Sequence, residues 1–555
     1  YVIHEFDPWF NYRATEFVVE NGWEKFQAWF DHKAWYPLGR HVGSTTYPGL
    51  QLTAWGIFEG LKKAGYPSTA PRVKAHEVIA SDSCVPRRSL FTGALGYEVT
   101  RSANSAVGAT AIMAVLPAHL MRSVAGGYDN ESVAVTAIVA TFYCWVRSLR
   151  TSRSWPFAIL CALAYIYMVA AWGGYIFVLN MIGAHAALLV LLGRFSTRLY
   201  LAYSMWFVIG TTGALFGPAR YLVGWQPVQS LEQLGPLAVF CILQILQITQ
   251  LISRIRRLDE LGRFKLRMLT FAGAVLALFV LSAVMLPSGF FGPLSARVRG
   301  LFIRHTKTGN PLVDSVAEHQ ATPVTVYWQY FHVVCFIGPI GTIACLFKRT
   351  DASIFFLLYA LLGAYFSSKM IRLVLLLSPA ASVAGGAALG GLVDMTVTAM
   401  YADAEAAKRK EPTAAAGPPP TTASAKKPLS NRPEKKNKGA KRKPESSSLT
   451  EPLREDLDEL TELFNESVEA RRAGGVAAIA VCLFVGVARF MPHCLRLGRS
   501  LSEPQIMLRG KDKSGEPLII DDFRETYWWL RNHTPEDARV MAWCGCNGSA
   551  CHYNL

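Results

Sequence analysis

The chain has 555 residues, of which 51% are hydrophobic and only 17% charged. A soluble domain carries about 25% charged residues, and the hydrophobic residues here fall in many runs long enough to cross a bilayer. These properties exclude a soluble globular enzyme, a disordered scaffold and a fibrous protein. The sequence predicts an all-α polytopic membrane protein.

The chain opens with a polar, aromatic-rich segment, residues 1–83, which begins at Tyr1 without a cleavable signal peptide. The next run, 84–99, is hydrophobic but contains Arg87 and Arg88. Charged side chains are costly in hydrocarbon, so whether this run spans the membrane is left open.

Eleven hydrophobic runs predict transmembrane helices, ten of them within a multi-span bundle at 84–394. A long external loop, 288–325, interrupts the bundle, and residues 492–555 follow the last span. The runs are 103–121, 132–148, 156–172, 174–193, 198–216, 237–253, 268–287, 326–347, 353–367, 371–394 and 475–491.

Much of the net charge of +16 lies between the last two spans. Residues 408–443 hold twelve Lys or Arg against two Glu, among many Pro, Ala and Ser. Such a segment cannot bury enough apolar surface to fold, so we expect residues 395–474 to be a basic, disordered loop. Attraction to anionic lipids is an alternative for it, and we expect no nucleic-acid partner.

Short loops rich in Lys and Arg stay on the cytosolic side of a membrane. If the predicted spans alternate in direction, the basic loops near residues 147–153, 194–198, 254–267 and 348–349 all lie on that side with 395–474. The basic residues in loop 288–325 are a contrary signal, weakened by the length of that loop.

The same alternation gathers acidic residues on the opposite, non-cytosolic face. Asp7, Asp129, Glu131 and Glu318 are expected there, together with Arg372 at the start of a span. Carboxylate oxygens suit Mn²⁺ or Mg²⁺, and a hard dication beside an arginine recognises phosphate. The pattern therefore predicts a divalent-metal site, although each residue taken singly is equally typical of a helix cap.

Other residues are less specific. Cys544, Cys546, Cys551 and His552 match neither a paired zinc motif nor a haem motif. Asn532 and Asn547 begin Asn-X-Ser/Thr tripeptides on the predicted non-cytosolic side and are glycosylation candidates, whereas Asn465 lies in the cytosolic loop.

Several motifs resemble those of the catalytic subunit of eukaryotic oligosaccharyltransferase, in the same order. The longest is His4-Glu5-Phe6-Asp7-Pro8-Trp9-Phe10-Asn11-Tyr12-Arg13. Others are Trp35-Tyr36-Pro37-Leu38-Gly39-Arg40, Tyr47-Pro48-Gly49-Leu50, Gly127-Tyr128-Asp129-Asn130-Glu131, Trp172-Gly173-Gly174-Tyr175, Ser315-Val316-Ala317-Glu318-His319-Gln320, Arg372-Leu373 and Pro535-Glu536-Asp537-Ala538-Arg539.

This resemblance implies a GT-C glycosyltransferase in the endoplasmic reticulum membrane, with a lumenal active site and accessory subunits. It would transfer an oligosaccharide from dolichyl pyrophosphate to the Asn of Asn-X-Ser/Thr in acceptor polypeptides. By match to the family motifs, the metal ligands are Asp7, Asp129 and Glu131. Glu318 and Asp7 engage the acceptor amide, and Arg372 meets the pyrophosphate.

The sequence departs from the family at both ends. The family motif Trp-Trp-Asp-Tyr-Gly, which binds the sequon hydroxyl, begins at Trp543 but continues here as Cys544-Gly545-Cys546-Asn547. We expect a truncated lumenal domain and a missing first transmembrane helix, and a frame shift or misplaced splice junction after Trp543 would explain the departure. A non-catalytic relative that keeps the donor site, and a secondary transporter, are alternatives.

Overall fold

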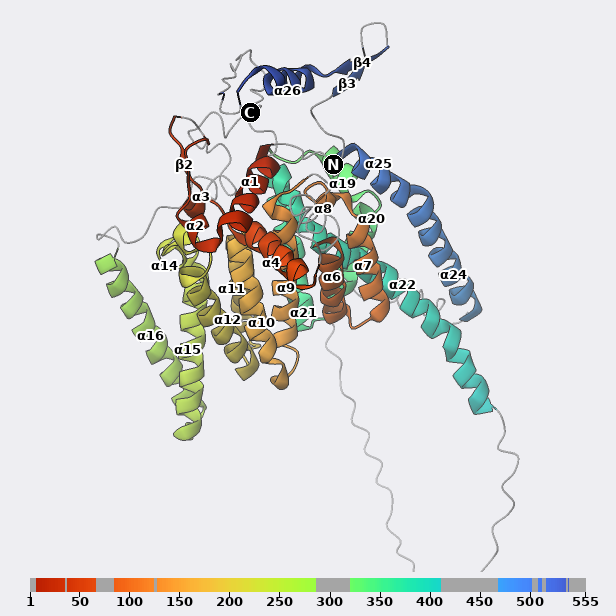
Figure 1. The fold of residues 1–555 in the computed structure, drawn as a ribbon. Helices are drawn as coiled ribbons and strands as arrows, with labels where there is room; N and C mark the ends of the chain where they lie inside the picture. The colour runs from red at the N-terminus through yellow and green to blue at the C-terminus, as the bar shows by residue number, and fades with distance from the viewer. Residues whose placement is uncertain are drawn as a thin grey trace, which may run out of the picture. The chain divides into compact units, whose positions relative to one another are not determined.

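The computed structural model describes residues 6–34, 37–65, 84–123, 127–285, 320–410, 468–501, 508–511, 516–535 and 538. The chain divides into two units. Unit 1 contains residues 1–391 and 484–555, and unit 2 contains residues 392–483. The described residues are mostly helical, with two short antiparallel hairpins (Figure 1). The predicted helical fold class is therefore confirmed.

The opening segment contains helices that the sequence patterns did not predict. α1 (Phe6–Asn21), α2 (Trp23–Gln27), α3 (Val42–Thr45) and α4 (Gly49–Lys63) flank an antiparallel hairpin of β1 (Phe30–Asp31) and β2 (Arg40–His41). A small buried core holds α1, α2 and α3 together through Ala14, Val18, Phe26 and Val42. α4 packs against α1 and against the bundle helices α9 and α10, so it connects the opening segment to the bundle.

The helices from α6 to α25 follow in chain order. Those up to α21 lie in unit 1, α22 runs from unit 1 into unit 2, and most of α24 lies in unit 2. Their bounds are α6 (Cys84–Thr100), α7 (Ala103–Val115), α8 (Pro117–Leu120), α9 (Asn130–Ser148), α10 (Pro156–Ala171), α11 (Tyr175–Leu191), α12 (Thr197–Phe216), α13 (Arg220–Val223), α14 (Gln226–Gln229), α15 (Leu234–Ile255), α16 (Glu260–Met285), α19 (Val324–Phe331), α20 (Val334–Leu346), α21 (Asp351–Lys369), α22 (Val374–Lys410), α24 (Val468–Val485) and α25 (Met491–Leu501).

The remaining elements are short. Single turns are η2 (Ser152–Ser154), η4 (Ile371–Leu373) and the π-helical η5 (Gly486–Phe490). After α25 come β3 (Leu508–Lys511) and β4 (Pro517–Ile520), which pair antiparallel, and then α26 (Asp522–His533). In unit 2, Arg472 of α24 donates to the carbonyl oxygens of Ala399 and Met400 in α22, at 3.0 and 2.8 Å.

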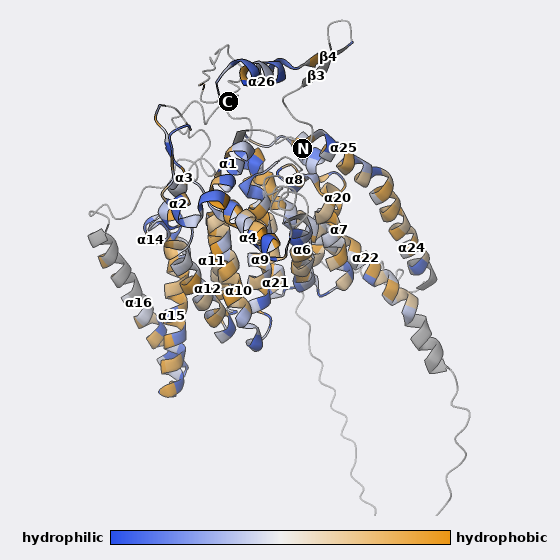
Figure 2. Ribbon diagram, viewed as in Figure 1, coloured by the Kyte–Doolittle hydropathy of each residue, from blue (hydrophilic) through white to orange (hydrophobic). Residues whose placement is uncertain are grey.

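Among the described residues, six helices are long and apolar enough to cross a membrane, or seven if α19 and α20 form one broken span. Figure 2 shows hydrophobic residues predominating along α10, α11, α15 and α24. All eleven predicted runs contain a helix, but α7 and α11 are shorter than the length needed to qualify as spans. α9 and α16 are also not among the helices that qualify within the described residues.

The run 326–347, predicted as one helix, is two helices. α19 and α20 meet at an angle of 86°. His332 lies at the break with φ of 45°, in the left-handed region that a helix cannot continue through. Hydrophobicity alone carries no signal for such a break, because the residues on both sides remain apolar.

Residues 84–99, whose membrane span was left open, form most of α6, which packs against α7 and α9. Arg88 is completely buried and donates from Nη1 to the Ser123 hydroxyl at 2.9 Å. Because the guanidinium points to a polar partner inside the protein, it is not exposed to lipid.

Glycines allow α7 and α22 to approach closely in unit 1. A Cβ added at Gly386 would lie 2.4 Å from the backbone nitrogen of Ala109 and 2.6 Å from the backbone oxygen of Ser105. Small residues at such contacts let helix backbones pack against each other in membranes.

We expect Gly386→Ala to lower the thermal unfolding temperature of the purified protein, because overpacking against backbone atoms costs about 1–3 kcal/mol. Gly391→Ala, on the same helix, is the matched control because a Cβ there meets nothing within 4 Å. The control should be neutral or stabilising, since Ala favours a helix over Gly by about 1 kcal/mol. Equal unfolding temperatures for the two variants would contradict this account of the contact.

Candidate active site

Two acidic residues are buried at the start of α9. Asp129 is the N-cap residue, and its carboxylate accepts the backbone N–H of Asn130 at 2.6 Å. Glu131 follows in the first turn. The side chains of Asp129 and Glu131 are only 12% and 1% exposed. The positive end of the helix dipole favours carboxylates at this position, which is the local reason that the sequence tolerates two of them.

Two arginines compensate this negative charge. Arg372, in η4 between α21 and α22, places Nε 2.6 Å from Oε1 of Glu131. Arg122 places Nε 3.2 Å from Oε2 of Glu131 and Nη1 3.7 Å from Oδ2 of Asp129. Glu131 therefore lies between two guanidinium groups that come from different parts of the chain.

Hydrogen bonds connect α1 to Tyr128, the residue before Asp129. Asn11 donates from Nδ2 to the carbonyl oxygen of Tyr128 at 3.2 Å, and the hydroxyls of Thr15 and Tyr128 are 2.9 Å apart. Asp7 lies one turn before Asn11 and is exposed. Because residues four apart share a helix face, α1 presents Asp7 on the same side as the bonds to Tyr128.

Electrostatic effects connect Asp7 with its neighbours. Burial raises the pKa of the Asp129 carboxyl above its usual value, Arg122 and Arg372 lower it, and Asp7 raises it further. Burial lowers the pKa of Arg40, and Asp7 opposes that shift. The structure therefore brings Asp7, Asp129, Glu131 and Arg372 into one electrostatically connected group, and their joint role as a metal and phosphate site stays a prediction.

The donor chemistry of this group suits a divalent cation. Among the described residues, no three His, Cys, Asp or Glu side chains are close enough together to hold a metal ion as they stand. However, the buried Oε2 of Glu131 has an ion pair with Arg122 but no hydrogen bond within the described residues, and burial disfavours the charged form of Asp129. A cation bound to these carboxylate oxygens would stabilise the charged forms of both side chains.

Several predicted residues lie outside the described part of the chain, namely Glu318, Trp543 and Asn547. Gln320, which is described, accepts the backbone N–H of Ile371 at 3.0 Å, so the chain two residues after Glu318 is bound next to Arg372. Asn532 is exposed near the end of α26, and its glycosylation stays a prediction.

Arg122 was not predicted from the sequence. The available signal was its position, seven residues before Asp129 in a segment that leads into an acidic helix start. Sequence patterns do not show that the guanidinium of Arg122 contacts two carboxylates further along the chain. The contact depends on the turn that follows α8, because α8 ends at Leu120.

The chain is similar to known proteins over most of its length. The chain is 34% identical over 550 residues to the dolichyl-diphosphooligosaccharide–protein glycosyltransferase subunit stt-3 of Caenorhabditis elegans. It is 33% identical over 548 residues to the subunit STT3 of Dictyostelium discoideum. Both alignments cover 98% of this chain and 66% of the relative. The chain thus spans about two thirds of the length of these relatives.

Solved structures show the same fold. The archaeal oligosaccharyltransferase AglB from Archaeoglobus fulgidus, in complex with an inhibitory peptide and a dolichol-phosphate, superposes with a TM-score of 0.62 at 16% identity, covering 96% of this chain and 55% of AglB. A second structure of the A. fulgidus enzyme, a complex with Zn and sulfate, gives a TM-score of 0.52 at 17% identity over 74% of this chain and 48% of the other. The predicted GT-C bundle is confirmed.

Residues 1–385 match the family model for the N-terminal part of oligosaccharyl transferase STT3. This match contradicts the secondary-transporter alternative. The chain therefore belongs to the STT3 family of oligosaccharyl transferases.

Proposed function

We propose that this protein transfers an oligosaccharide from dolichyl pyrophosphate to the Asn side chain of Asn-X-Ser/Thr in acceptor polypeptides. The observation that carries the proposal is Glu131, a buried carboxylate between Arg122 and Arg372 beside Asp129. Acidic ligands for a cation and arginines for phosphate occur together at this site. A pyrophosphate leaving group requires both, because negative charge accumulates on it as the glycosidic bond breaks.

Asp7, Asp129 and Glu131 are the residues proposed to hold Mn²⁺ or Mg²⁺. When bound, such an ion supplies a Lewis acid that stabilises the departing pyrophosphate. A structural neighbour solved with Zn and sulfate agrees with a metal in this fold. Arg372 is proposed to bind the pyrophosphate, because a guanidinium can donate two parallel hydrogen bonds to phosphate oxygens. Its present bond to Glu131 keeps it oriented in the site.

The amide nitrogen of the acceptor Asn has to be activated as a nucleophile. Resonance in the Asn amide leaves its nitrogen a poor nucleophile. We propose that Asp7 and Glu318 accept its two N–H bonds and turn the nitrogen out of conjugation. Trp543 is proposed to contribute to recognition of the sequon Ser or Thr. Asp7 is exposed at the surface of α1, where an incoming peptide can reach it.

The cellular setting is also a proposal. Arg147, Arg150 and Arg198 lie at the other end of the bundle from Asp129 and Glu131, and basic residues favour the cytosol. We therefore place the site on the lumenal side of the endoplasmic reticulum membrane. The relatives are named as subunits, which supports accessory subunits as partners of this chain.

The test is peptide glycosylation by the full-length protein, with dolichyl-pyrophosphate oligosaccharide as donor. Peptides containing Asn-X-Thr should be glycosylated, and the matched Gln-X-Thr peptides should not. Chelation should stop transfer, and Mn²⁺ or Mg²⁺ should restore it. Transfer that persists after complete chelation would contradict the metal assignment. Donor binding without any glycopeptide would instead identify the chain as a non-catalytic relative.

A further inference from the structure

A second polar cluster lies at the opposite end of α9. Glu131 and Arg147 are sixteen residues apart on this helix, which corresponds to about 24 Å along its axis. Near Arg147 the bundle contains a partly open cavity of about 140 Å³. Beside two aliphatic side chains, its walls are formed by Arg101, Arg150, Arg198, Thr350, Asp351 and Ala352.

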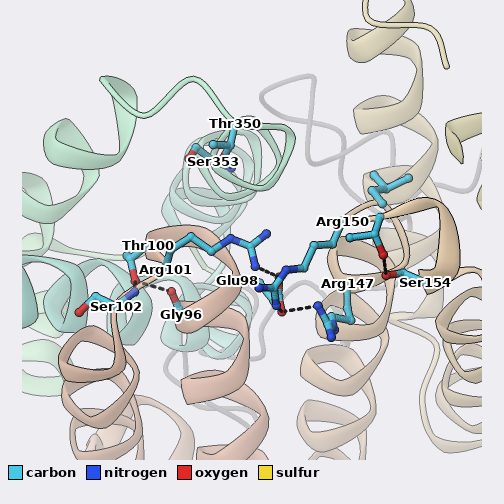
Figure 3. Close-up of polar contacts among 12 residues, drawn as sticks. Gly96, Glu98, Thr100, Arg101, Ser102, Arg147, Arg150, Ser154, Thr350 and Ser353 are labelled. Atoms are coloured by element: carbon cyan, nitrogen blue, oxygen red, sulfur yellow. Dashed lines mark hydrogen bonds and ion pairs between the residues drawn. The ribbon is translucent and has the colours of Figure 1, made fainter.

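One buried carboxylate organises the arginines beside this cavity. The Glu98 side chain is 3% exposed, and three guanidinium groups converge on it (Figure 3). Arg101 lies 2.6 Å from Oε2, while Arg150 and Arg147 lie 3.2 and 3.5 Å from Oε1. Arg101 also adopts φ of 61°, a conformation in which Gly is usual after a helix end. Arg101 therefore has a backbone conformation that is unfavourable for a residue with a side chain.

The positive charge exceeds what the carboxylates there neutralise. Arg198 donates to two neutral acceptors, the carbonyl oxygens of Leu149 and Arg150, at 3.3 and 3.0 Å. Asp351 pairs with Arg194 at 2.8 Å. Five arginines (101, 147, 150, 194 and 198) thus accompany two carboxylates (98 and 351), which leaves a surplus of three positive charges.

The start of α21 adds a second feature that favours an anion. Thr350 caps this 19-residue helix and accepts the backbone N–H of Ser353 at 3.1 Å. Thr350, Asp351 and Ala352 line the cavity, so the first turn of the helix borders it. Helix N-termini carry a partial positive charge and bind phosphate and similar anions.

The position in the bundle indicates where such an anion would come from. Arg198 and Asp351 lie in the first turns of α12 and α21, two of the helices that are long and apolar enough to cross a membrane. The cavity is therefore at the depth where a bilayer changes from hydrocarbon to headgroups. A phosphate group at this depth can belong to a lipid of that leaflet or to a soluble phosphate.

We propose that the cavity between Arg101, Arg150, Arg198 and the start of α21 binds a phosphate group, separate from the candidate active site. Phosphate accepts charge-assisted hydrogen bonds from several guanidinium groups at once. The surplus of arginines supplies positive charge for such a ligand, the partly open cavity supplies space, and the N-terminus of α21 supplies a dipole pointing at it. This site does not depend on the proposed transferase activity.

The test measures binding of two probes to the full-length protein in neutral detergent. One probe is phosphatidic acid, counted by native mass spectrometry against phosphatidylcholine, and the other is inorganic phosphate, followed by thermal stabilisation. The variants are Arg198→Gln, which removes charge, and Ala352→Leu, which fills the cavity without changing charge. Arg153→Gln is the control, since Arg153 is exposed in nearby η2 and is not part of the cavity wall.

We expect Arg198→Gln and Ala352→Leu each to weaken phosphatidic acid binding by about 10-fold or more, since a hydrogen bond to a charged group is lost or blocked. Arg153→Gln should change it by less than about 2-fold, as is usual for exposed charges. Arg198→Lys should bind better than Arg198→Gln, which separates lost charge from misfolding.

The two probes identify the source of the phosphate. Stabilisation by inorganic phosphate that the two cavity variants abolish supports a soluble ligand, whereas selective retention of phosphatidic acid alone supports a lipid headgroup. Three results would overturn the proposal. They are an equal loss in Arg153→Gln, unchanged binding in Ala352→Leu, and no binding of either probe by the unmodified protein.

Discussion

Replacing Glu131 by Gln is expected to reduce oligosaccharide transfer by about 10²- to 10³-fold, the size of effect seen when one preorganised charged contact to a transition state is removed. Glu131 contacts both Arg122 and Arg372, and it is a proposed metal ligand. The substitution removes the charge but keeps the shape of the side chain. It therefore disturbs the position of two arginines and the affinity for a cation together.

The measurement is the rate of glycopeptide formation per folded molecule, with folding followed by thermal unfolding. Removing one partner of a buried ion pair costs about 3–5 kcal/mol, so stability has to be measured separately from activity. Asp31→Asn is the control, because Asp31 is also buried and paired with an arginine, Arg13, at 2.9 Å. Asp31→Asn should lose stability but retain transfer. A comparable loss of transfer in both variants would show that Glu131 acts only through folding.

Arg372→Ala is expected to weaken use of the lipid-linked donor about 100-fold. Two charge-assisted hydrogen bonds to the pyrophosphate would be lost, at about 1.5 kcal/mol or more each. Arg372→Lys should recover only part of this loss, because an ammonium group cannot make the paired contact of a guanidinium. The effect should appear in the KM for the donor, with the KM for the acceptor peptide little changed.

The initial rate is measured against donor concentration at saturating peptide, and then against peptide concentration at saturating donor. Arg13→Ala is the matched control, since it also removes an arginine from a buried carboxylate, that of Asp31. Its donor KM should match that of the unmodified protein. If Arg372→Ala raised the KM for the peptide and left the KM for the donor unchanged, Arg372 would belong to acceptor recognition and its assignment here would be wrong.

Much of the architecture was predictable because membrane spans follow directly from hydrophobic runs. The grouping of Asp129 and Glu131 with Arg372 followed from counting spans and assigning sides, which needs no three-dimensional information. Asp129 also has the side chain expected of a helix N-cap residue, and the structure uses it in that way.

Other features depend on contacts between distant residues. In the sequence, Arg88 indicates a poor membrane span. Only the structure shows that its guanidinium is bound to Ser123. The break at His332 comes from backbone conformation in a continuously apolar run. Arg122 and Glu98 illustrate the same limit, because each acts through partners supplied by other elements. A sequence shows which charges exist but not which ones face each other.

The most direct test of the central claim uses the full-length protein, a donor with a labelled oligosaccharide and an Asn-X-Thr peptide, analysed by mass spectrometry after a single turnover. The account predicts that the intact oligosaccharide is attached to the Asn side chain, and that Asp7→Asn reduces this product by about 10²-fold or more. Labelled oligosaccharide released into water by both proteins, with no glycopeptide from either, would contradict it.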